Sequence, residues 1–478
     1  MKVVKYALSA LVAICLAVVA YLTITFDPRD HAPRIVELVK QKTGRTLQIK
    51  GEIGLSFWPD LGVRLGAVSL SERAGDEPFA DIQNARLRVR LLPLLSRELI
   101  ADEIVIQGAH VRLTRFVDGR LNIDDLLNGE GGALQIDIGR VTLERSALTY
   151  RDLASGGVYE LSAIELETGR ISNAQSTPVK LALRARNEPQ TFDIATALKG
   201  RLTLDAARQR YTLDGAALEV KGRAAGMTEL VARATGNFRV SVADRNLDAT
   251  QVAVALTGAL EGQAVEAAIE SPAVVLGSGR SQGEAMVVSM RATGPAGTTR
   301  VSLKLPRLEY AADTLTANDA AIELELERAG RLFGATIQSP LEIGLAARAL
   351  RLTRIESGFN ASGAGLPRAG ITGALTGSAS VDLTKQSVQT TLAGLIGESK
   401  IKAALTASGF ATPIYTFAID LDQLDLDRYV VADAKQRKTD SVMELAELST
   451  LPATGTLNIG MLKTAGVRAR NVRLVVKP

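Results

Sequence analysis

The chain has 478 residues, of which 46% are apolar and 23% charged, the composition of a folded protein with about three domains or one long repetitive one. Its single cysteine and two histidines exclude an intrachain disulfide, a multi-cysteine metal site and a histidine-rich metal centre. The net charge of +4 comes from interleaved acids and bases, and only 4% of residues are aromatic, which argues against nucleic-acid binding.

The N-terminus has the pattern of a membrane anchor. Tyr6 to Phe26 carry no charge, and about 20 helical residues cross the ~30 Å hydrocarbon core of a bilayer. Lys2 and Lys5 precede this run, so the positive-inside rule places the N-terminus in the cytoplasm and the body beyond the membrane. The alternative is a signal peptide cleaved near Val18–Ala20, which the apolar continuation to Phe26 disfavours.

A short helix is expected directly after the anchor. Pro33–Lys42 places Ile35, Leu38 and Val39 on one helical face, and Gly44 is a plausible stop. The apolar stripe and basic flank fit two positions: on anionic headgroups at the membrane surface, or packed on the helix's own domain.

From Leu47 onward the apolar pattern changes to a period of two, which is typical of strands with one apolar face. Hairpin turns are predicted at Asp118–Gly119 and, more weakly, at Asp214–Gly215. The clearest alternating stretches are Ala85–Leu91, Leu134–Ile138, Leu202–Leu204 and Ile322–Glu327. The body is therefore predicted to be mainly β, with few short helices.

One pattern recurs weakly along the body: a glycine, a strand, a polar turn and a second strand. It occurs in Lys199–Asp214, Gly236–Ala249 and Gly377–Thr390. Repetition of one hairpin predicts a curled antiparallel sheet rather than separate globular domains. Patterning leaves open whether the apolar face is covered by protein or forms a trough, and an aliphatic trough would suit acyl chains.

Two segments resemble catalytic or metal-binding motifs. Gly279–Gly283 matches the G-x-S-x-G nucleophile elbow, but a strand is predicted after it and no histidine lies downstream, so we interpret it as a turn. Asp420, Asp422, Asp425 and Asp427 lack the glycine of a calcium loop and fit solvated strand and turn positions. With no catalytic constellation, no metal site and no cofactor motif, the chain is predicted not to be an enzyme.

Several segments resemble, in order, the AsmA family of Gram-negative envelope proteins. Ile53–Leu65 is similar to the family's strand, aromatic–proline turn and second strand, and Gly108–Asn122 is similar to its G-x-x-v-x-l…d-G-x-x-N hairpin. Lys42–Arg45, Leu148–Asp152 and Leu424–Tyr429 also match. The resemblance implies an inner-membrane anchor, a periplasmic body related to bridge-like lipid-transfer proteins, and a role in outer-membrane assembly.

The expected organisation has four parts. Residues 1–27 form the cytoplasmic N-terminus and anchor, and 28–130 a chorein-like region with the helix and hairpins. Residues 131–430 form the repetitive β-groove, and 431–478 a C-terminal region that is short or truncated relative to the family.

The expected function is binding and conduction of phospholipid acyl chains along an apolar β-groove. The alternative is a non-enzymatic periplasmic scaffold that affects outer-membrane protein assembly or targeting. Expected partners are phospholipid, the inner membrane, and the outer membrane or its assembly proteins, with no nucleic acid and no cofactor. With either pleat able to form the inner face, the candidate groove residues are Leu87, Val89, Leu91, Leu113, Leu202, Leu204, Leu324 and Leu326.

Overall fold

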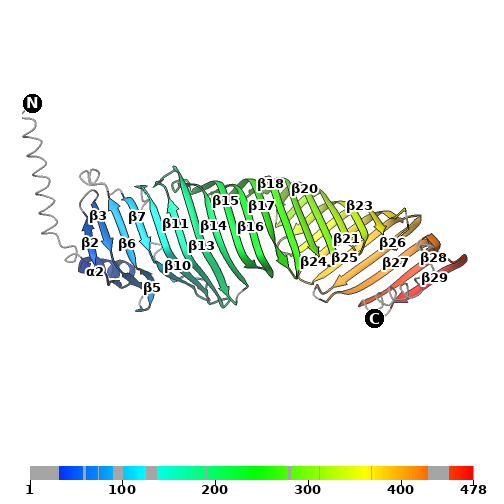
Figure 1. Cartoon of the computed structure of the whole chain (residues 1–478), viewed down its shortest axis with the longest axis horizontal. Coiled ribbons are helices and arrows are strands. Elements are labelled where there is room, and N and C mark those ends of the chain that lie inside the picture. Colours follow the sequence, from blue (N-terminus) through cyan, green and yellow to red (C-terminus); the bar gives the residue numbers. More distant parts are fainter. Residues whose placement is uncertain are drawn as a thin grey trace, which may run out of the picture. The chain divides into compact units, whose positions relative to one another are not determined.

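The computed structural model forms two compact units, Met1–Ala243 and Asp244–Pro478. The described part of the chain is almost entirely β-strand (Figure 1). The exceptions are helix α2 (Ala32–Thr43), a 3-10 turn η2 (Leu426–Arg428) and the connecting turns. The structure describes residues 32–56, 61–73, 75–89, 101–124, 137–189, 191–277, 281–311, 313–367, 369–410, 412–428 and 452–476.

The expected anchor, Tyr6–Phe26, lies outside these residues and stays a prediction. Among the helices that the structure describes, none has the length and apolar character needed to cross a bilayer.

The helix predicted after the anchor is confirmed as α2. It ends where Gly44 adopts a left-handed φ of 67° and its amide donates to the Lys40 carbonyl, 2.9 Å away. Glycine takes this conformation without the steric cost that a Cβ would bring.

The described residues of the first unit form sixteen strands after α2. They are β1 (Leu47–Ile49), β2 (Ile53–Ser56), β3 (Leu61–Leu65), β4 (Val68–Ser71), β5 (Pro78–Ile82), β6 (Asn84–Val89), β7 (Ala101–Gln107), β8 (His110–Arg115), β9 (Asp137–Ile138), β10 (Val141–Asp152), β11 (Gly157–Thr168), β12 (Ile171–Ser172), β13 (Ser176–Glu188), β14 (Phe192–Asp205), β15 (Arg210–Ala224) and β16 (Met227–Ser241).

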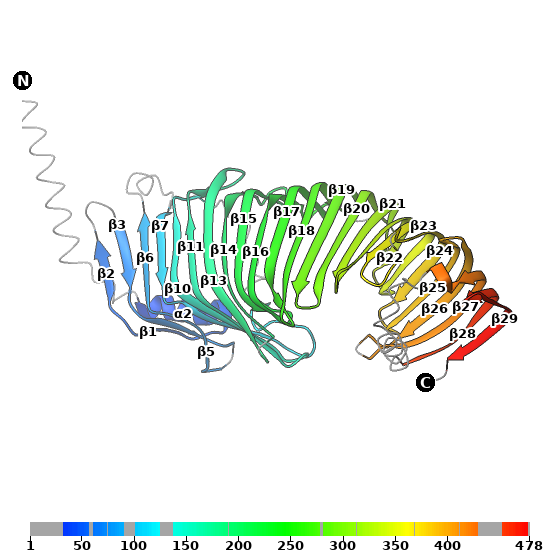
Figure 2. The same cartoon turned by 45° about the vertical axis from the view of Figure 1, so that its right-hand side comes forward.

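Long strands of this unit lie in chain order as antiparallel neighbours from β10 onward, with only the short β12 interposed in sequence (Figure 2). Before them, β7 and β8 both run parallel to β10, β7 beside its first half and β8 beside its second. The predicted strand pair within Ile53–Leu65 is confirmed as β2 and β3, which pair antiparallel.

Of the two predicted hairpin turns, the first is confirmed. At Asp118–Gly119 the Phe116 amide donates to the Arg120 carbonyl across the turn. The second prediction is wrong, because Asp214–Gly215 lies inside β15. Gly215 has a φ of 57° at a register shift against β16, and a left-handed glycine serves a β-bulge as well as a tight turn.

In the part of the second unit that the structure describes there are thirteen strands, each antiparallel to the next except for the parallel pair β27 and β28. They are β17 (Asn246–Leu260), β18 (Gln263–Leu276), β19 (Ser281–Gly294), β20 (Gly297–Ala311), β21 (Thr314–Arg328), β22 (Arg331–Gly344), β23 (Ala349–Gly363), β24 (Ile371–Asp382), β25 (Ser387–Ile396), β26 (Ser399–Ser408), β27 (Ile414–Asp425), β28 (Ala453–Thr464) and β29 (Val467–Val476).

The repeated hairpin pattern is confirmed where it falls inside one unit. Lys199–Asp214 belongs to the β14–β15 pair and Gly377–Thr390 to the β24–β25 pair. Gly236–Ala249 joins the last strand of the first unit to the first strand of the second.

A crease of buried residues crosses the strands of the second unit. Ala320 and Ser339 are cross-strand partners in it. Its members lie within β18, β20, β21, β22 and β23 and are between 2% and 5% exposed: Ser271, Leu305, Ala320, Ser339 and Ile355. Register shifts of β21–β22, β22–β23 and β23–β24 fall at this crease, and such bulges bend the strands that carry them.

Prolines mark the crease on alternate strands. Pro272, Pro306 and Pro340 follow one another at intervals of 34 residues, the length of one two-strand repeat. Proline has no amide to donate, so the hydrogen-bond ladder cannot close at these positions.

Candidate functional site: apolar rows across the strands

An apolar row crosses the second unit perpendicular to its strands. Its members are cross-strand partners on β17 to β23, and such partners share one face of a sheet. Met290 is 40% exposed and the others are half-buried. The row consists of Leu256, Ala267, Met290, Val301, Leu324, Ala335 and Phe359.

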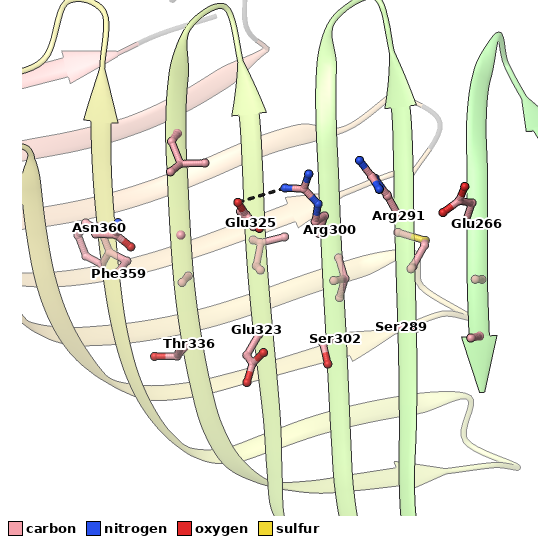
Figure 3. A pocket seen from close by; sticks show the side chains of 18 of the residues that line it. Glu266, Ser289, Arg291, Arg300, Ser302, Glu323, Glu325, Thr336, Phe359 and Asn360 are labelled. Atoms are coloured by element: carbon pink, nitrogen blue, oxygen red, sulfur yellow. Dashed lines mark ion pairs between the residues drawn. The ribbon is translucent and has the colours of Figure 1, made fainter. Parts of the chain in front are cut away.

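Polar rows lie on both sides of this apolar row (Figure 3). One contains Glu266, Arg291, Arg300, Glu325 and Asn360, and the other Ser289, Ser302, Glu323 and Thr336. Their residues are immediate sequence neighbours of the apolar row, so their side chains point to the opposite face of the sheet. Within the polar row that begins with Glu266, Arg300 Nη1 lies 3.1 Å from Glu325 Oε1.

A cavity of about 1060 Å³ is lined by these three rows. Leu332 and Thr336, from the polar face, line the cavity, whereas Leu303 and Leu326, from the apolar face, do not. The cavity therefore lies on the polar face, with the backbone of the apolar row as its floor. The apolar side chains project to the other side.

The first unit repeats this arrangement. An apolar row runs across β10, β11 and β13–β16, and consists of Leu143, Leu166, Leu181, Leu198, Leu218 and Ala234. A cavity of about 960 Å³ lies over it on the opposite, polar face, because Glu103 and Val105 line the cavity and Ile104 between them does not.

Ion pairs between neighbouring strands hold the polar flank of the first unit. Lys180 Nζ lies 3.2 Å from Glu167 Oε2, and Arg233 Nη2 lies 3.3 Å from Glu219 Oε1. Lys221, which donates to the same carboxylate, and Arg233 lower the pKa of Glu219. The flank is thus charged but locally neutralised.

Protein covers little of either apolar face. Within the described residues the buried apolar cluster gathers at the crease, and consists of Leu305, Leu308, Ala317, Ala320 and Leu341. The leucines of both rows keep part of their surface accessible. A sheet covered by a second layer would bury such positions fully, so the described residues favour an accessible aliphatic face.

Candidate groove residues of the second unit lie on this face. Leu324 is a member of the row, and Leu326, two residues along the same strand, pairs with Phe333. The Phe333 and Phe359 rings stack with centroids 6.0 Å apart on the same face.

Candidate groove residues of the first unit also share the face of its row. Leu202 and Leu204 lie on β14 at even spacing from Leu198. Leu87 pairs with Ile104, and Leu113 pairs with Tyr150.

Two candidates have no described side chain. Val89 ends β6, with its side chain outside the description, and Leu91 lies outside the described residues altogether.

Sequence reasoning missed most of the row leucines. Leu166, Leu181 and Leu198 each sit in an alternating stretch, so local pattern marks them as inward-facing. Their alignment depends on the register between strands, which local pattern does not contain.

Residues of the acidic cluster on β27 pair with side chains of the neighbouring strand β28. Asp425 Oδ2 lies 2.9 Å from Lys463 Nζ, and Asp420 accepts from the Asn458 amide at 2.7 Å. Lys463 lowers the pKa of Asp425, and Asp425 raises the pKa of Lys463. No group of three or more histidine, cysteine or acidic ligands is assembled among the described residues.

The G-x-S-x-G segment opens a strand. Ser281 is the first residue of β19, whereas the nucleophile elbow requires a helix after its serine. Gly279 and Arg280 lie outside the described residues.

The AsmA family profile matches residues 1–447, nearly the whole chain. The chain belongs to the AsmA family. Protein AsmA of Escherichia coli (strain K12) is 32% identical over 107 residues, which are 22% of this chain and 17% of that protein. No solved structure shows a significant match. Family membership points to a role in the cell envelope, and the AsmA-family assignment agrees with the predominance of β-structure.

Proposed function

We propose that this AsmA-family protein is anchored in the inner membrane and binds phospholipid acyl chains along its apolar rows. The single observation that carries the proposal is the alignment of Leu143, Leu166, Leu181, Leu198 and Leu218 in one accessible row. The body would lie in the periplasm, with the N-terminus in the cytoplasm.

The dimensions of the row suit an acyl chain. Neighbouring strands lie ~4.8 Å apart, so a row over six strands runs roughly 24 Å. Half the hydrocarbon core of a bilayer, the depth that one lipid tail occupies, is about 15 Å. Each methylene removed from water contributes about 0.8 kcal/mol, and this gain has no directional requirement that would trap the chain at one position.

Photo-crosslinking with a matched control tests the proposal. A photoreactive amino acid replaces Leu198 or Leu324 in the full chain, and in control variants it replaces Ala197 or Glu325, which are sequence neighbours on the opposite face. After irradiation in cells and purification in mild detergent, lipid adducts are identified by mass spectrometry.

We expect phospholipid adducts at Leu198 and Leu324 and few at Ala197 and Glu325. Equal labelling of both faces, or no lipid at any site, would overturn the proposal. Adducts to unfolded outer-membrane proteins in place of lipid would instead support the assembly-scaffold alternative.

A further inference from the structure

One end of the first unit presents exposed apolar side chains. Val117 is 76% exposed, Leu153 45% and Phe116 41%. They lie on two adjacent turns, because Arg115 pairs with Asp152 and the Leu153 amide donates to the Arg115 carbonyl at 2.9 Å. Single exposed apolar residues are common on soluble proteins, but three on neighbouring turn tips form a patch.

Aromatic residues gather behind these tips in a chain that contains few of them. The Tyr150 and Tyr159 rings have centroids 5.8 Å apart, and those of Tyr159 and Phe192 are 6.4 Å apart. Tyr159 is 37% exposed. These residues lie near the ends of β10, β11 and β14 that adjoin the tips. Tyrosine is enriched at the boundary between headgroups and hydrocarbon, because its ring is apolar and its hydroxyl polar.

The same end is fastened to the segment that follows the expected anchor. Arg45, just after α2, donates from Nη2 to the Asn122 carbonyl. Asn122 in turn accepts from the Thr114 amide at 3.0 Å, at the base of the turn that carries Phe116 and Val117. Residues 27–31 separate the apolar run from α2 and reach at most roughly 20 Å. The tips are thus tied to a helix that begins close to the bilayer.

We propose that Phe116, Val117 and Leu153 insert into the phospholipid bilayer that holds the anchor, with Tyr150 and Tyr159 at headgroup depth. This inference rests on the anchored location in the proposed function and adds a second contact with the membrane. Such a contact fixes the orientation of the first unit on the bilayer, which a single anchoring helix leaves free to rotate.

Depth-dependent fluorescence quenching in the full chain tests the inference. Trp58 is the single tryptophan, so Trp58→Phe gives a background in which Val117→Trp is the only reporter. The protein is reconstituted into vesicles of phosphatidylethanolamine and phosphatidylglycerol that contain phosphatidylcholine brominated on its acyl chains. Ala207→Trp, in the exposed β14–β15 turn at the other end of the strands, is the matched control.

We expect the Val117→Trp emission to shift to the blue and to be quenched, and the Ala207→Trp emission to remain unquenched. Leu153→Trp in the same background provides a second reporter at the patch and should behave like Val117→Trp. If the protein floats with the vesicles but Val117→Trp and Ala207→Trp emit equally, the proposed insertion of the patch into the bilayer is overturned. Lipid crosslinks at Leu198 would in that case still support the proposed function. Protein that does not float would overturn both the anchor and the docking.

Discussion

The guanidinium carbon of Arg45 lies 4.7 Å from the centre of the Phe79 ring, and both side chains are shielded from solvent. Arg45 is 0% exposed, donates to the Ser71 carbonyl at 3.2 Å and lies 3.7 Å from Glu72 Oε2. A buried cation is tolerated only when its donors are satisfied, and here backbone carbonyls, a carboxylate and an aromatic face do so.

We therefore expect Arg45→Lys to destabilise the start of the first unit, although it keeps the charge. The lysine ammonium cannot reproduce the planar fork of donors, and disrupting a buried charged group costs about 3–5 kcal/mol. Hydrogen exchange of the β4 and β8 amides measures the local loss. Arg73→Lys, at an exposed arginine beside Gly44, is the control, and equal protection in the two variants would contradict the expectation.

Substitution within the leucine row should reduce lipid binding. Leu181→Ser and Leu198→Ser each remove an aliphatic contact of about 1.5–3 kcal/mol, equivalent to about tenfold or more in affinity. The measurement is phospholipid that copurifies with the full chain, quantified by mass spectrometry. Ala182→Ser and Ala197→Ser change the opposite face of the same strands and should retain the lipid. If the leucine variants and the alanine variants lose the same amount of lipid, the loss results from impaired folding, and lipid binding by the leucine row is contradicted.

Gly373 leaves room for the ring of Phe359, the last residue of the apolar row in the second unit. A Cβ added to Gly373 would lie 2.3 Å from Phe359 Cε1 and 2.7 Å from the Leu395 carbonyl oxygen. Gly373→Ala should therefore displace the ring and cost about 1–3 kcal/mol of unfolding free energy. Gly358→Ala is the control, because its Cβ would meet only Thr336 Oγ1 at 3.6 Å. Denaturant unfolding measures both, and a neutral Gly373→Ala would refute the close fit.

The Asp425–Lys463 pair should make stability depend on pH. Folding lowers the pKa of Asp425 from 3.8, so its contribution is present above the unfolded pKa and is lost as pH falls through the folded pKa. Folding raises the pKa of Lys463 from 10.5, so its contribution is present below that pKa and is lost at higher pH. Asp425→Asn should lower Tm at neutral pH and match the unmodified chain in acid. Asp319→Asn, at an exposed β21 carboxylate, is the control. A constant difference at all pH values would count against the pair.

Local pattern was sufficient for the strands but not for their alignment. The alternation in Ile322–Glu327 predicts a strand and an apolar face, because side chains of a strand point alternately to its two faces. The same alternation cannot show that Leu324 stands beside Val301 and Ala335, since that depends on register with two other strands.

The Asp214–Gly215 turn was predicted wrongly and the crease was not predicted, because in both cases one residue type is compatible with two backbone structures. Gly215 satisfies a hairpin turn and a bulge equally well, so its neighbours on β16 decide between them. The recurrence of Pro272, Pro306 and Pro340 in the sequence indicates the crease. A single proline, however, argues against a central strand and so predicts the end of a strand. The recurrence of proline every 34 residues, the length of a two-strand repeat, is what indicates a bend within each strand instead of a strand end.

That spacing makes the length of the sheet a modular property. A segment of 34 residues adds two strands, returns the chain to the same edge and brings the next proline onto the same crease. Such a segment can be gained or lost without turning an apolar side chain to the wrong face, because each repeat contacts mainly its neighbours. Duplication of one hairpin could thus adjust reach in discrete steps while every existing strand kept its register.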